Sequence, residues 1–93
     1  MTVFAKDPAS TVDYSVDWSD WVRTGEAINS TVWDIVPLEA GGLAAGGEFA
    51  SAAVRGVYVS GGIAGNLYRL SCTIATDQGR VVARGMTIRI LER

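Results

Sequence analysis

Residues 68–90, YRLSCTIATDQGRVVARGMTIRI, decide the fold class of this chain. Apolar residues recur at nearly every second position on both sides of a polar Asp77-Gln78-Gly79 turn. A period of two predicts a pair of half-buried strands joined as a β-hairpin. The apolar positions are Tyr68, Leu70, Cys72 and Ile74 in the first strand and Val82, Met86, Ile88 and Ile90 in the second.

The length of the turn fixes the register of this hairpin. A two-residue loop, Gln78-Gly79, would place the two apolar sets on opposite faces of the sheet. A three-residue loop pairs Ile74 with Val82 and places both sets on one face, so we predict this loop, with Gly79 in the left-handed conformation. Arg84 is the one charged residue on the inward face, and we expect it near the edge of the sheet or reaching outward.

The rest of the chain predicts further short strands and no helix. Residues 12–18 alternate apolar and polar side chains. Residues 27–36 are rich in β-branched residues, and their two apolar phases require a bulge or burial on both faces. Residues 50–60 predict another strand or two, while the glycine- and alanine-rich residues 38–49 allow one short strand near Leu43.

The predicted architecture is an all-β sandwich of immunoglobulin (Ig) or fibronectin III type, with about seven short antiparallel strands and a C-terminal β-hairpin. Tyr68 stands at the start of the penultimate strand, where such folds place a tyrosine corner. The disulfide and core-tryptophan pattern of antibody domains is missing. We expect an extended N-terminal arm over residues 1–10 and a single Ig-like domain over residues 11–93.

Composition argues against several classes of protein. The chain has 93 residues, a net charge of −2 and no basic patch, which is atypical of a nucleic-acid binder. No apolar run is long enough to span a membrane, and the N-terminus lacks the apolar core of a signal peptide. Cys72 is the single cysteine, so no internal disulfide forms. We expect folding in the cytoplasm and added stability from partners or from copies of the chain.

The sequence offers no set of residues suited to catalysis, and we predict neither enzymatic activity nor a cofactor or metal. Histidine is absent, so the hydroxyl groups lack the usual activating base. Asp13, Asp17 and Asp20 match no calcium loop and are interpreted as solvated carboxylates, of which Asp17 or Asp20 can cap a corner. Residues 41–47 lack the lysine of a phosphate-binding loop, and Cys72 is expected to be buried and inert.

The order of several motifs resembles a known family. The motifs are Lys6-Asp7-Pro8; Asp13-Tyr14 with Asp17-Trp18-Ser19-Asp20-Trp21; Gly25, Ile28 and Trp33; Val57-Tyr58-Val59-Ser60-Gly61-Gly62 with Gly65 and Tyr68; Ile74, Thr76 and Gly79-Arg80; and Arg84, Ile88, Ile90 and Glu92. Over nearly the whole chain they resemble small structural proteins of tailed bacteriophages, the phage fibre–tail adaptors or Gp77-like family. The chain departs from the family at Val22 and in residues 40–53, where the family tends toward serine and threonine.

The resemblance implies a non-enzymatic Ig-like component of the virion that joins other virion proteins. We expect it to bind tail, neck or fibre proteins as an adaptor, in several copies, without nucleic acid or membrane. The predicted contact residues lie in segments expected to be too irregular for the core: Phe4, Lys6 and Asp7 in the arm, and Leu43 and Phe49 in the glycine-rich segment.

Two alternatives to the adaptor stay open. One is a capsid decoration protein, which is also structural but sits on the head lattice. The other is a carbohydrate-binding module that contacts host glycans through exposed, coplanar Trp18 and Trp21. The apolar phase of Trp18, Trp21 and Trp33 favours packing in the core instead.

Overall fold

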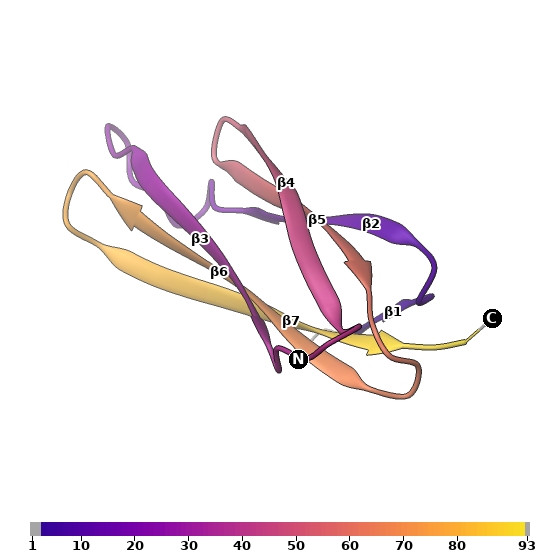
Figure 1. Cartoon of the computed structure of the whole chain (residues 1–93). Helices are drawn as coiled ribbons and strands as arrows, with labels where there is room; N and C mark the ends of the chain where they lie inside the picture. The colour runs from indigo at the N-terminus through magenta and orange to yellow at the C-terminus, as the bar shows by residue number, and fades with distance from the viewer. Residues whose placement is uncertain (1–2, 93) are drawn as a thin grey trace.

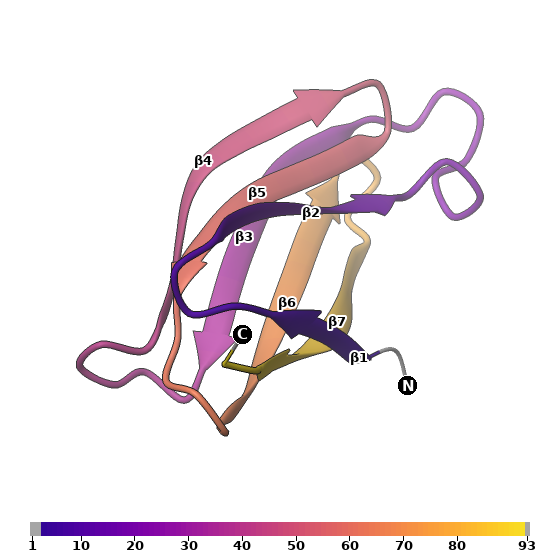
Figure 2. The same cartoon turned by 90° about the vertical axis from the view of Figure 1, so that its right-hand side faces the viewer.

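The computed structural model describes residues 3–92, which form seven strands in two sheets (Figure 1). One sheet has the order β1-β7-β6-β3 and the other β2-β5-β4. The two sheets pack face to face, and Figure 2 shows β1 and β2 in front, one from each sheet. The strands are β1 (Val3–Lys6), β2 (Thr11–Asp17), β3 (Ile28–Val36), β4 (Leu43–Ser51), β5 (Val54–Gly61), β6 (Leu67–Thr76) and β7 (Val81–Ile90).

The strand order is that of an Ig-like sandwich, as predicted. The sheets β2-β5-β4 and β7-β6-β3 correspond to the B-E-D and G-F-C arrangements of immunoglobulin constant-type domains. One pair departs from the predicted antiparallel pattern, because β1 pairs in parallel with β7. Four residues of the expected N-terminal arm therefore add an edge strand to the larger sheet.

The closing hairpin has the predicted register. Ile74 lies opposite Val82 and Tyr68 opposite Ile88, so both apolar sets face the core. The Thr76 N–H donates to the Arg80 carbonyl at 2.9 Å across the three-residue turn, and Gly79 has the left-handed φ of 77°. Arg84 is exposed, and its guanidinium lies 4.7 Å from the centre of the Trp18 ring, over the end of the core.

The tyrosine corner is also confirmed. The buried Tyr68 hydroxyl accepts a hydrogen bond from the Ile63 N–H at 3.1 Å, which fixes the chain as it crosses from β5 to β6. Gly62 makes this crossing possible, because its φ is 106° and a Cβ atom there would lie 2.6 Å from Ile90. The residues just before Tyr68 thus serve the fold.

The tryptophans pack into or against the core. Trp18 is fully buried, and Trp21 closes one end with its ring at 71° to that of Trp18. Trp33 lies on β3 directly opposite Cys72 of β6, where antibody domains place their core tryptophan. Trp33 is only partly buried and Cys72 is a free thiol, so the buried tryptophan and disulfide of antibody domains are not reproduced, as predicted. A bulge between Ile28 and Ser30 turns Ile28 to the inward side with Trp33 and Ile35, as predicted, whereas Val32 stays on the outer face and is 59% exposed.

A buried ion pair holds the turn of the closing hairpin to the connection between β2 and β3. Glu26 accepts hydrogen bonds from Arg80 Nη2 at 2.6 Å and Nε at 2.9 Å, and from the Thr76 hydroxyl at 2.6 Å. The Arg80 guanidinium also stacks 3.8 Å above the Trp21 ring. The hydrogen bonds from Arg80 hold the pKa of Glu26 well below its usual range, so this carboxylate stays charged inside the fold.

Candidate protein-interaction site

The predicted contact residues divide between the two lateral sides of the sandwich. Phe4, Lys6 and Asp7 lie where β1 crosses to β2, whereas Leu43 and Phe49 belong to β4 at the opposite side. The structure therefore does not bring the five residues together into one surface.

Lys6 connects the two sheets through a hydrogen bond inside the fold. Only 2% of the residue is exposed, and its ammonium donates to the carbonyls of Asp7 at 2.9 Å and Gly61 at 2.8 Å. Burial lowers the pKa of this amine. The bond to Gly61 joins the end of β1 to the end of β5 in the other sheet. The expectation that Lys6 belongs to an irregular segment outside the core is wrong.

The other two residues of the arm also serve the fold. The Asp7 carboxylate accepts the Ala9 N–H at 2.7 Å and shapes the turn between β1 and β2. The Phe4 ring is partly exposed and packs 5.2 Å from the Tyr14 ring. Contact with a partner through Phe4 or Asp7 stays a prediction.

The glycine-rich segment forms a longer strand than the short one near Leu43 that its sequence allows. β4 runs for nine residues and pairs antiparallel with β5, with a bulge between Gly46 and Phe49. Leu43 is only 4% exposed and belongs to the core, so its placement in an irregular segment was wrong. The sequence signal that could have revealed β4 is the strand that follows it. Residues 54–61 form a clear strand, and a hairpin at this place needs a second strand before them.

β4 and β3 are edge strands on the same side of the molecule. Within the described residues, β4 pairs with β5 alone and β3 with β6 alone, so each leaves one edge without a partner strand. Residues 43–46 of β4 are Leu-Ala-Ala-Gly, which places only small side chains beyond Leu43. Exposed edges without charge are usually blocked in native proteins, because they pair readily with other strands.

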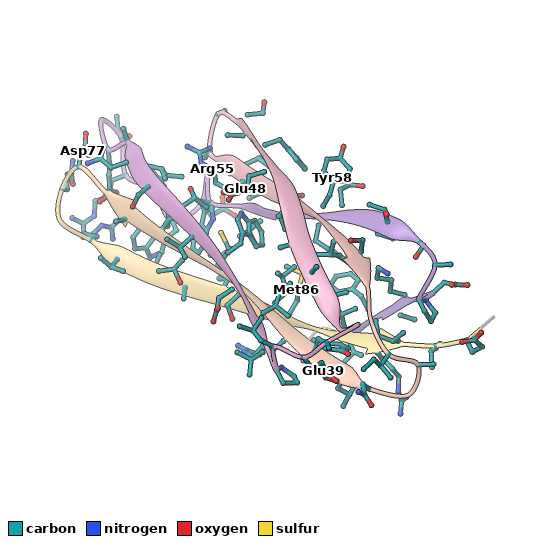
Figure 3. All side chains as sticks on the ribbon, viewed as in Figure 1. Glu39, Glu48, Arg55, Tyr58, Asp77 and Met86 are labelled. Carbon is teal, nitrogen blue, oxygen red and sulfur yellow. The ribbon has the colours of Figure 1, made fainter. Side chains whose placement is uncertain are left out.

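A groove of about 710 Å³ separates these two edges. Residues 33–35 of β3 form one wall, and the connection and start of β4, residues 38–45, form the other. Leu38 is 82% exposed at the rim. Two carboxylates, Asp34 and Glu39, border the groove, and no basic residue lines it. Figure 3 shows Glu39 at the end where β3 and β4 approach each other.

A second exposed feature, which we call the aromatic patch, consists of Phe49 and Tyr58 on the outer face of the smaller sheet. Their ring centres lie 5.6 Å apart, and 37% of Phe49 and 47% of Tyr58 are exposed. The Phe49 ring lies against Gly56, where a side chain would collide with it. Figure 3 shows Tyr58 on the outside of the sheet, in contrast to Met86, which lies between the two sheets.

The structure contradicts the geometry that glycan binding would require. Trp18 is fully buried, and the Trp18 and Trp21 rings are neither coplanar nor both exposed. The Arg80 guanidinium covers Trp21 at 3.8 Å. The two rings therefore form no platform on which a sugar could stack.

Asp17 and Cys72 both have structural roles. The Asp17 carboxylate accepts the Ser19 N–H at 2.9 Å and caps the corner after β2, as predicted. Burial raises the pKa of the Cys72 thiol, which keeps it protonated and unreactive. Residues 3–92 contain no group of three or more acidic, cysteine or histidine side chains placed to hold a metal ion, and no helix that could span a membrane.

Comparison with known proteins places the chain in a family. No curated protein matches the chain significantly. The family model described as podophage GP4 fiber-tail adaptor protein gp77 matches residues 6–89, which is most of the chain. The chain therefore belongs to the Gp77 family of podophage fiber-tail adaptor proteins.

Proposed function

We propose that this protein is a non-enzymatic component of a podophage particle that connects the fibres to the tail by binding a different virion protein on each side. The match of residues 6–89 to the fiber-tail adaptor family is the observation that supports this role most strongly. The protein would be made and folded in the host cytoplasm before it is assembled into the particle.

Two separate surfaces support a connecting role. The groove between β3 and β4 opens at the side of the sandwich, whereas the aromatic patch faces outward from the smaller sheet. Aromatic residues are enriched at protein interfaces and often contribute most of the binding energy. Copies of the chain arranged by the symmetry of the tail would present each surface several times.

Deletion of the gene from the phage tests this function. We expect particles with normal heads and tails but without fibres, and we expect the fibres to return when the wild-type chain is supplied from a plasmid. Quantitative mass spectrometry of wild-type particles should find a copy number set by the tail symmetry, far below that of a protein covering the head lattice. Fibres at wild-type level on particles that lack the chain would contradict the proposal.

A further inference from the structure

We propose that the groove between β3 and β4 binds an extended segment of a neighbouring virion protein that carries apolar and basic side chains. The segment pairs with the free edge of β4, inserts an apolar side chain into the groove, and places lysine or arginine near Asp34 and Glu39. This inference rests on the proposed function, because it takes the partner to be another component of the particle.

The backbone of β4 is suited to accept another strand. Among the described residues its outer edge has no partner strand, and Ala44, Ala45 and Gly46 are exposed residues that let another backbone approach closely. Gly47, with a φ of 72°, begins the bulged part of the strand and limits straight pairing to residues 43–46. Such strand addition gains affinity from main-chain hydrogen bonds, and neighbouring pockets supply the specificity.

The groove supplies a pocket beside this edge. Its volume of about 710 Å³ is within the range that holds a ligand or several side chains. Trp33, Ile35 and Leu43 give it apolar walls, and the highly exposed Leu38 would lose its contact with water when the groove is filled. An apolar side chain of the partner therefore has a surface to bury against.

The charges around the groove select the partner. Asp34 and Glu39 are the charged residues that line the groove. Neither forms an ion pair within residues 3–92, where the ion pair found is Glu26–Arg80. Arg69 does not neutralise them from the next strand, because its guanidinium lies against Gly85 of β7. A basic segment is therefore favoured. A second copy of this chain, paired edge to edge along β4, would bring like charges together.

Cross-linking inside assembled particles tests where the partner lies. A photoreactive benzoylphenylalanine is placed at Leu38 or Ala44 beside the groove, and at the exposed Val81 on the larger sheet as the matched control. We expect the groove positions to cross-link to a lysine- or arginine-bearing segment of a different virion protein, identified by sequencing the linked peptide. A link to another copy of this chain, a link to an acidic segment, or no link in particles that contain the protein would overturn the inference.

Charge reversal tests the chemistry of the partner. In the Asp34→Lys/Glu39→Lys variant we expect the number of copies per particle to fall by about tenfold, and in the control Asp20→Lys/Glu92→Lys, at exposed positions, to stay at the wild-type value. An unchanged Tm of the isolated variant shows that it still folds. If the wild-type chain is absent from particles, the proposed function fails. If the wild-type chain is present and the groove variant is incorporated equally well, this inference alone fails.

Discussion

The β6–β7 and β4–β5 hairpins share the same topology but differ in how much of their surface is buried. The β6–β7 hairpin buries most of one face and is held at its turn by the Glu26–Arg80 pair. The β4–β5 hairpin buries Leu43, Val57 and Val59 but leaves the edge of β4 free and two aromatic rings on its outer face. We therefore attribute stability to the first hairpin and propose partner contact for the second.

The largest expected effect tests the stabilising hairpin directly. Leu70 is fully buried in β6, so Leu70→Ala should lower the free energy of unfolding by about 2–5 kcal/mol through lost burial and the cavity left behind. The matched change Ala44→Ser on exposed β4 should stay within about 0.5 kcal/mol of wild type. Urea denaturation of both variants checks this. Equal losses would remove the distinction between the hairpins.

The next largest effect on stability is expected from the Glu26–Arg80 ion pair at the turn of the β6–β7 hairpin. Glu26→Gln removes the charge that binds Arg80 and should lower the urea midpoint, whereas Glu48→Gln on exposed β4 should leave it unchanged. Because the pKa of Glu26 is lowered from 4.5, its stabilisation is complete above that pH and declines as the pH falls toward the lowered pKa. The gap between wild type and Glu26→Gln should therefore be larger at about pH 7 than at about pH 3. A gap that widens in acid would contradict this account.

The third prediction concerns the hydrogen bond from Lys6 to the Gly61 carbonyl, at the end of the β4–β5 hairpin. Lys6→Met keeps the aliphatic stem but loses both hydrogen bonds and leaves the Gly61 carbonyl without the ammonium donor. We expect a loss of about 1–3 kcal/mol. Arg89→Met, on the exposed face of β7, serves as the control and should have little effect. Wild-type stability in Lys6→Met would mean that β1 is dispensable to the sandwich and free to contact a partner.

The last prediction compares substitutions at two glycines, Gly62 and Gly46. Gly62→Ala should destabilise the fold by about 1–3 kcal/mol, because φ is 106° and the new methyl group would meet Ile90. At Gly46 of β4 a Cβ atom meets no other atom within 4 Å, so Gly46→Ala should stabilise the strand by about 0.5 kcal/mol. Thermal unfolding of the two variants distinguishes a glycine required by packing from one that keeps an edge accessible. Shifts of the same sign would contradict this distinction.

The sequence predicted the stabilising hairpin because there each residue favours the same structure. Apolar residues in phase and Gly79 in the turn determine the register together, and Tyr68 marks the corner. The nine-residue length of β4 and the burial of Leu43 are not predicted, because glycine and alanine carry almost no strand signal and only pairing with β5 fixes them. The burial of Lys6 is not predicted because lysine is rarely buried, and the Gly61 carbonyl that accepts its hydrogen bond lies 55 residues away.

A cryo-EM map of intact particles tests the central claim most directly. We predict a strand of another virion protein running beside residues 43–46 of β4, about 4.8 Å from it, with a side chain in the groove between Trp33 and Leu43. A map in which this edge faces solvent, while the chain is attached to the particle through the outer face of the larger sheet, would contradict it.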